Sequence, residues 1–156
     1  YGAGIGKYAS GQLPDVAFDA SGRPKPITEI EGMIGVIAHP TPTIDLYGYG
    51  GIEREDKEVF TGAGGVPLGY GNPAYSNVDC SYGNLSFNKA KTASCNVDQL
   101  WEGQIGGWWN FYKGDYGRMA LGLSYEYVNV GTFAGVGGSP STHENIVMTS
   151  FRYYPF

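Results

Sequence analysis

The chain has 156 residues, which is enough for one domain. Its net charge is −5, and its ten Lys and Arg residues are scattered, so it has no basic stripe for nucleic acid. Glycine supplies 26 residues, more than twice the usual share of about 7%, while charged residues make up 16% against about 25% in soluble domains. With no run of eighteen apolar residues, the sequence predicts no transmembrane helix.

The first 38 residues contain two candidate strands. Residues 1–9 form a weak, glycine-rich strand pattern, and residues 10–26 read as a loop with three prolines and two glycines. Gly2 to Lys7 resembles part of a phosphate loop, but Tyr8 stands where a magnesium-binding Ser or Thr belongs, so we expect no nucleotide and no other cofactor. A strand follows at about 27–38, and the prolines of 39–43 predict a tight turn.

The middle of the chain combines one strand with a long polar connection. A strand at 43–53 is followed by a loop at 54–99, with a short hairpin expected near 57–70. Cys80 and Cys95 lie in this loop without a Cys-x-x-Cys spacing or a nearby His, so we expect no metal site. They predict a disulfide and an oxidising, extracytoplasmic setting, with two unpaired thiols as the alternative.

The last third of the chain has the clearest pattern. Residues 100–112 and 118–127 alternate apolar and mostly polar side chains with a period of two, on either side of a turn-rich segment at 113–117. They predict a long β-hairpin. A connection at 131–144 leads to a final strand at 145–156, which ends on an aromatic residue. Long strands with aromatic ends favour a transmembrane β-barrel, although a soluble antiparallel sandwich also alternates in this way.

The lengths of the connections separate these two folds. Along the chain they are long (10–26), short (39–42), long (54–99), short (113–117) and long (131–144). Outer-membrane barrels have short turns on the periplasmic side and long loops outside, whereas a sandwich has no reason to sort its loops in this way. We therefore predict an all-β, antiparallel, up-and-down transmembrane barrel spanning 1–156 as a single domain, with 54–99 as an outer loop.

About six strands are too few for a closed barrel, since the smallest single-chain barrels use eight. We expect this chain to be the C-terminal part of a larger barrel, with edge-to-edge pairing of copies as the alternative. The residues expected to face lipid are Ile30, Ile34, Val36, Ile44, Leu46, Trp101, Ile105, Trp109, Phe111, Met119, Leu121, Leu123, Tyr125, Val147, Phe151 and Tyr153. The residues expected to line the interior are Glu29, Glu31, Asp45, Glu53, Glu102, Arg118, Glu126 and Arg152.

Four segments carry a resemblance to a known group of proteins: 39–51, 69–73, 108–118 and 149–156. They resemble the C-terminal region of largely uncharacterised outer-membrane β-barrel proteins of Gram-negative bacteria. The resemblance implies a bacterial outer-membrane location, and it supplies no catalytic residues. The aromatic C-terminus also resembles the signal by which the barrel assembly machinery recognises its clients.

The expected function is a porin-like channel for small solutes or ions. The acidic excess of the interior predicts a preference for cations if water fills it, and the alternative is that acids and arginines pair and plug the barrel. A structural or partner-binding barrel that does not conduct, contacting a neighbouring membrane or surface protein, and a soluble adhesin or lectin remain open. We expect no enzyme, because His39 and His143 lie in a turn and a loop without a catalytic constellation. Outer-membrane lipid is the expected partner, and nucleic acid is not.

Overall fold

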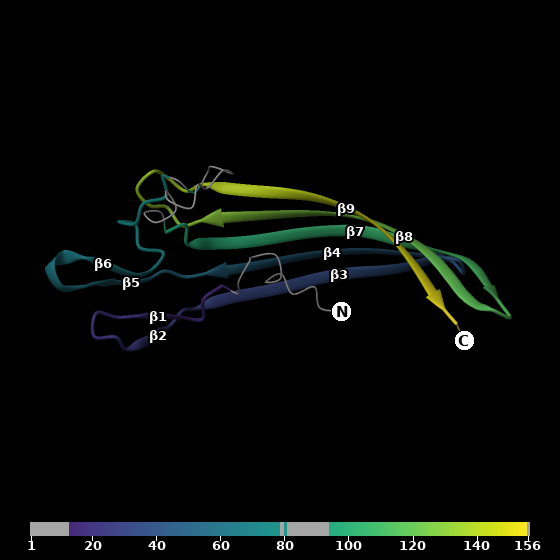
Figure 1. Cartoon of the computed structure of the whole chain (residues 1–156), viewed down its shortest axis with the longest axis horizontal. Helices are drawn as coiled ribbons and strands as arrows, with labels where there is room; N and C mark the ends of the chain where they lie inside the picture. Colours follow the sequence, from purple (N-terminus) through teal and green to yellow (C-terminus); the bar gives the residue numbers. More distant parts are fainter. Residues whose placement is uncertain (1–12, 79, 81–93, 156) are drawn as a thin grey trace. The chain divides into compact units, whose positions relative to one another are not determined.

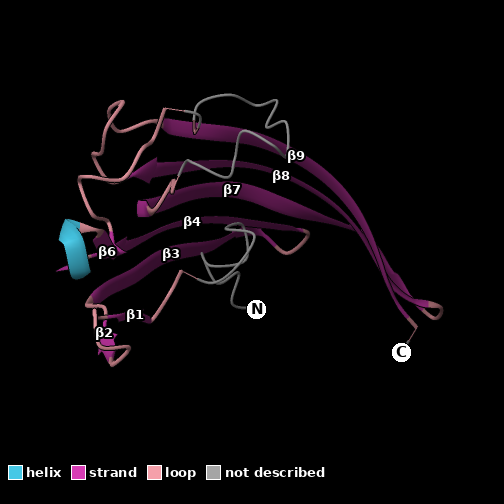
Figure 2. Cartoon of the chain, turned by 60° about the vertical axis from the view of Figure 1, so that its left-hand side comes forward, coloured by secondary structure: helices cyan, strands magenta, loops and turns pink. Residues whose placement is uncertain are grey.

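The fold is all-β. The computed structural model describes residues 13–78, 80 and 94–155, and contains no α-helix within them. Figure 2 shows strands joined by loops, with one short 3-10 helix, η2, at Ala63–Gly65. The strands are β1 (Val16–Phe18), β2 (Pro24–Pro26), β3 (Glu29–Thr41), β4 (Ile44–Glu55), β5 (Glu58–Thr61), β6 (Pro67–Tyr70), β7 (Val97–Gly114), β8 (Gly117–Thr132) and β9 (Ser141–Tyr154). The expected all-β class is therefore confirmed.

The largest sheet has five strands in the order β3-β4-β7-β8-β9 (Figure 1). Neighbouring strands are antiparallel. Between β4 and β7, Asn110 N donates to Thr43 O at 2.8 Å at one end, and the Arg54 side chain lies 3.9 Å from Asp98 near the other. Between β8 and β9, the Tyr125 hydroxyl donates a hydrogen bond to Asn145 Oδ1 at 2.6 Å. The edge strands β3 and β9 consequently run in the same direction.

The strands that were expected from alternation are present and longer than expected. β7 has 18 residues and β8 has 16, joined by a turn in which Gly117 has a φ of 98°. The predicted turn at His39 was placed too early, because β3 continues through Pro40 to Thr41. Proline lacks an N–H, but an edge strand leaves one side of its ladder unpaired and so tolerates it.

Two small hairpins accompany this sheet. β5 pairs with β6 within the long loop, with Phe60 opposite Leu68, which confirms the hairpin expected near 57–70. β1 pairs with β2, with Ala17 opposite Lys25, so the expectation that 10–26 is only a loop was wrong in its second half. The Pro and Gly residues of that segment predict a loop, although the segment contains the three-residue strand β1. This strand buries Ala17 and exposes Val16 and Phe18.

The chain divides into two compact units. The first comprises Tyr1–Glu31, Ile52–Trp101 and Asn129–Thr142, and the second Gly32–Gly51, Glu102–Val128 and His143–Phe156. The first unit has a small apolar core of Ala17, Ile27, Tyr70 and Phe133, in which the last two rings meet edge to face at 5.7 Å. Complete burial of a side chain such as Ile27 or Phe133 stabilises the folded protein by about 1.5 to 3 kcal/mol.

Some expectations fall on residues 1–12, 79, 81–93 and 156, which lie outside the described residues. These are the strand at 1–9, the middle of the cysteine loop and the terminal Phe156. Within the described part, no helix has both the length and the apolar character needed to cross a membrane.

Candidate functional site

One face of the second unit exposes an extensive set of apolar side chains. Of the sixteen residues expected to face lipid, fourteen are exposed, and Ile44 and Met119 are half-buried. Twelve of the fourteen lie in the second unit, while Ile30 and Trp101 belong to the first. Ile34 and Val147 are 76% and 69% exposed, which is unusual for aliphatic side chains in well-ordered strands. Monomeric soluble proteins seldom expose contiguous apolar patches larger than a few hundred Å². This face therefore needs a covering environment.

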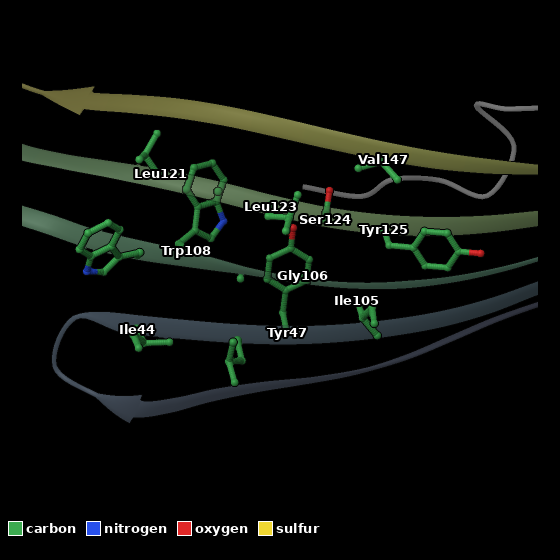
Figure 3. A pocket seen from close by; sticks show the side chains of 14 residues that line it. Ile44, Tyr47, Ile105, Gly106, Trp108, Leu121, Leu123, Ser124, Tyr125 and Val147 are labelled. Atoms are coloured by element: carbon green, nitrogen blue, oxygen red, sulfur yellow. The ribbon is translucent and has the colours of Figure 1, made fainter.

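The apolar face is hollowed where small residues interrupt it. The hollow, of about 840 Å³, includes Ile105, Leu121, Leu123 and Val147 in its lining (Figure 3). It lies over β4, β7, β8 and β9, and Gly107 adds no side chain to its floor. Its lining is almost entirely apolar, so it offers hydrophobic contact and little hydrogen bonding.

The opposite face of β7 and β8 has the reverse character. Glu102 and Glu126 are 6% and 2% exposed, and Ser124 is also buried. The Gln104 side-chain amide donates to Glu126 Oε2 at 3.1 Å. Among the described residues no donor reaches Glu102 Oε2. Burying a carboxylate costs free energy unless charge or hydrogen bonds compensate for the lost water. This face is therefore suited to a polar environment.

The residues expected to line the interior divide by burial. Glu53, in the first unit, is buried as Glu102 and Glu126 are, and Asp45 is half-buried. The other four expected lining residues are exposed, namely Glu29, Glu31, Arg118 and Arg152. The structure thus brings Glu102 and Glu126 together on neighbouring strands and leaves Glu29 and Glu31 on the edge strand.

The two arginines lie on aromatic rings. The Arg152 guanidinium lies 3.8 Å from the centre of the Trp108 ring, and that of Arg118 lies 4.4 Å from the centre of the Tyr154 ring. Such contacts contribute about 0.5 to 1 kcal/mol at exposed sites. They hold positive charge near the β7–β8 turn, some distance along the strands from Glu102 and Glu126.

Aromatic rings on this polar face also cover glycines of the adjacent strand. Figure 3 shows the Tyr47 ring lying across Gly106, and a Cβ at Gly106 would stand 2.5 Å from that ring. Trp108 covers Gly122 in the same way, at 2.8 Å. Sequence reasoning missed these contacts, because they depend on which residues of adjacent strands lie opposite each other.

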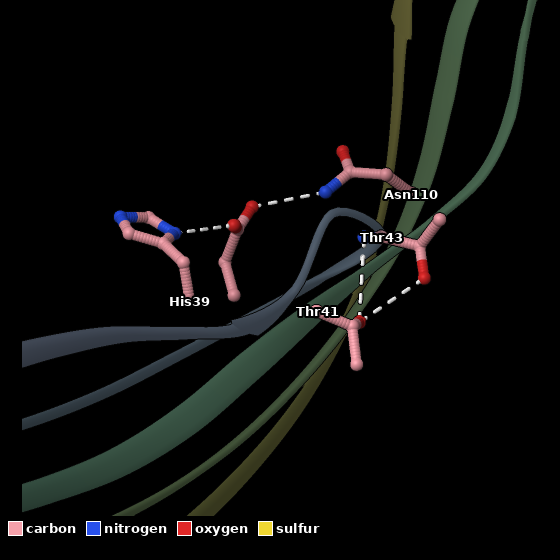
Figure 4. Close-up of polar contacts among 5 residues, drawn as sticks. His39, Thr41, Thr43 and Asn110 are labelled. Carbon is pink, nitrogen blue, oxygen red and sulfur yellow. Dashed lines mark hydrogen bonds and ion pairs between the residues drawn. The ribbon is translucent and has the colours of Figure 1, made fainter.

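A polar network stands at the β3–β4 turn (Figure 4). His39 Nδ1 lies 2.7 Å from Asp45 Oδ1, and the Asn110 amide donates to Asp45 Oδ2 at 2.9 Å. The Thr41 and Thr43 hydroxyls lie 3.3 Å apart beside it. The His39 side chain is 67% exposed, and its contact with Asp45, together with the Asn110 bond, links β3, β4 and β7 at this turn.

The cysteine loop is bonded to the β8–β9 connection beside its disulfide. Cys80 and Cys95 form the expected disulfide. Beside it, the buried Asn77 amide donates to Phe133 O at 2.7 Å and to Gly138 O at 2.9 Å. These bonds join the loop to the β8–β9 connection, which satisfies backbone carbonyls that would otherwise lose water without compensation.

A second carboxyl group in the first unit is buried more completely. Glu55, at the end of β4, is 1% exposed, and no donor among the described residues reaches either of its oxygens. It faces Tyr70, whose hydroxyl donates to Val97 O at 2.9 Å. Burial raises the pKa of Glu55 to about 7, and the neighbouring Glu29, Glu53 and Asp15 add to the increase.

The described residues contain no group of three or more His, Cys, Asp or Glu side chains arranged to hold a metal ion. Comparison with known proteins gave no match to any family model, curated protein or solved structure.

Proposed function

We propose that this chain forms part of the wall of a bacterial outer-membrane β-barrel that passes small solutes or ions and prefers cations. The observation that carries the proposal is that apolar side chains are exposed and polar ones are buried, the reverse of the usual distribution in a water-soluble domain. Aliphatic and aromatic residues are exposed on one face of the second unit, while Glu102, Ser124 and Glu126 are buried on the other. A wall between lipid and a polar interior accounts for both faces.

We expect the apolar face to be more stable against lipid than against water. Transferring one aliphatic or aromatic side chain out of water is worth about 1.5 to 3 kcal/mol, so fourteen exposed positions represent tens of kcal/mol. The segments that would cross the bilayer are 30–52, 101–128 and 143–155. The longest strands have 14 to 18 residues, more than the 9 to 11 or so that a tilted strand needs.

The ionic preference follows from the charge of the polar face. Six of the eight residues proposed to line the interior are acidic, and the two arginines lie against rings near the β7–β8 turn. Fixed negative charge concentrates cations and repels anions in a narrow aqueous passage. Glu102 and Glu126 would then contribute most where the passage is lined by β7 and β8.

A structural or partner-binding barrel that does not conduct is the second candidate. The rings of Tyr47, Tyr49 and Trp108 lie on the polar face and occupy space that a passage would need. A soluble adhesin remains the third, and it requires a second layer over the apolar face. Cell fractionation separates the membrane candidates from the soluble one: we expect the protein with outer membranes, and extraction without detergent would exclude the membrane proposal.

Conduction separates the first two candidates. In a planar bilayer with a salt gradient, we expect a reversal potential whose sign shows that cations pass more readily than anions. The double variant Glu102→Gln and Glu126→Gln should move that potential toward zero, whereas Glu58→Gln, in the β5–β6 hairpin, should leave it unchanged. An inserted protein that stays electrically silent would favour the structural barrel, and unchanged selectivity in the double variant would remove these two carboxylates from the proposed pathway.

A further inference from the structure

The Tyr70 hydroxyl faces the buried carboxyl of Glu55, and neither oxygen of Glu55 receives a hydrogen bond from a described residue. The Tyr70 hydroxyl has a single hydrogen, and it is used in the 2.9 Å bond to Val97 O. Tyr70 therefore presents only lone pairs to the facing carboxyl of Glu55. If Glu55 is ionised, two acceptors meet with no hydrogen between them. If Glu55 is protonated, its own O–H supplies the bond.

The surroundings give the ionised form little compensation. The titratable groups that face Glu55 are Tyr70 from β6, Glu53 from its own strand, Glu29 from β3 and Asp15 from the segment before β1. The three carboxylates repel a negative charge on Glu55, and Asp98 of β7 adds a further acid beside Tyr70. The two basic residues nearest to it in the sequence are engaged elsewhere: Arg54 lies 3.9 Å from Asp98, and Lys57 lies over the Phe133 ring at 5.6 Å.

Tyr70 also ties the β5–β6 hairpin to the core of the first unit, together with Phe60 of β5, which packs against the same core. It is the last residue of β6, it packs edge to face on Phe133, and it is 9% exposed. Its partner Val97 is the first residue of β7. A change at Glu55 therefore acts directly on the contact that holds the end of the hairpin in place.

We propose that Glu55 is a proton-dependent latch: its protonated carboxyl donates to Tyr70, Tyr70 donates to Val97, and release of the Glu55 proton to water frees the β5–β6 hairpin from the core. The latch is closed in mildly acidic conditions and opens as the pH passes through about 7, because burial raises the pKa of Glu55 to that value. The proposal concerns the first unit, and it does not depend on whether the chain conducts.

Amide hydrogen exchange tests the latch in the full-length chain. Protection factors, which correct for the pH dependence of intrinsic exchange, should fall at least about tenfold in the amides of β5 and β6 between about pH 5.5 and pH 8.5. Glu55→Gln keeps a donor toward Tyr70 and removes the titration, so protection should become independent of pH. The control Glu58→Gln, in the same hairpin, should behave as the wild type does.

Two further measurements keep the proposal decisive if Glu55→Gln folds poorly. Tyr70→Phe removes the oxygen between Glu55 and Val97, so the hairpin should exchange quickly at every pH. Infrared spectroscopy of the wild type should show a protonated carboxyl band that persists to near-neutral pH. A hairpin whose protection does not vary with pH in the wild type, or varies equally in Glu55→Gln, would overturn the latch, as would the absence of that band.

Discussion

The Tyr47 ring on β4 lies across Gly106 on β7, so closely that a Cβ at residue 106 would stand 2.5 Å from the Tyr47 ring and 2.9 Å from the Ser124 Cβ. Real Cβ atoms do not approach other atoms so closely. The glycine is therefore required by the ring that covers it, and not by backbone conformation, since Gly106 lies within a regular strand.

Gly106→Ala is expected to destabilise the protein by about 1 to 3 kcal/mol, the usual cost of inserting a group into a filled space. The Tyr47 ring can swing away, but the Ser124 Cβ cannot do so without moving β8. Gly103→Ala is the matched control on the same strand, because a Cβ there meets nothing within 4 Å. Denaturant unfolding in detergent measures both, and equal effects would contradict the assigned ring contact.

Arginine substitutions at two adjacent residues of β7 test the assignment of the two faces. Ile105 is 65% exposed on the apolar face, whereas Gln104 lies on the polar face beside Glu126. Ile105→Arg should cost about 2 to 4 kcal/mol of stability in lipid, since it places a charge at the membrane core. Gln104→Arg should cost much less, because the guanidinium can pair with Glu126.

Folding titrations in lipid vesicles supply the comparison between these two variants. If Ile105→Arg proved as stable as Gln104→Arg, the apolar face would not contact lipid. A reversed order would place lipid on the polar face and would contradict the proposed function altogether.

Opening the Cys80–Cys95 disulfide should loosen the first unit. In the chain-entropy model, a disulfide that closes a loop of about 15 residues raises the free energy of unfolding by roughly 3 kcal/mol. The double variant Cys80→Ser and Cys95→Ser should lose much of this stabilisation. Faster exchange is expected at the Asn77 amide, which donates to Val136 O in the β8–β9 connection, and at the Val136 amide, which donates back to Tyr75 O. Reduction of the wild type should reproduce the effect, and no change in either experiment would show that the loop is held by its other bonds.

Glu55 also predicts how unfolding depends on pH. Because folding raises its pKa from 4.5 to about 7, the folded chain retains a proton that the unfolded chain has released between these values. The stability associated with neutral Glu55 is complete below pH 4.5 and is lost as the pH rises through about 7, by up to about 3 kcal/mol. The difference in unfolding free energy between the wild type and Glu55→Gln should change by this amount over that range, and a flat difference would contradict it.

Alternation in the sequence was sufficient to predict strands β7, β8 and β9 and the apolar face that they share, because side chains of a strand point alternately to its two sides. The β1–β2 hairpin was missed, since its three-residue strands lie among prolines and a glycine that predict a loop. Glu55 lies in the charged run 54–58, where nothing in the sequence predicts burial, and its burial arises from residues distant in sequence such as Tyr70. Neither the ring over Gly106 nor the latch at Glu55 can be found without knowing how the strands pair.

The like-directed edges of the five-stranded sheet restrict how it can be completed. If the sheet closes into a cylinder with every ladder antiparallel, the gap between β9 and β3 must take an odd number of additional strands. If two copies of the chain were inserted with the same orientation, β9 of each copy would instead lie parallel to β3 of the other. In a cylinder whose ladders are all antiparallel, the number of added strands would be odd because β3 and β9 run in the same direction at the two edges of the order β3-β4-β7-β8-β9.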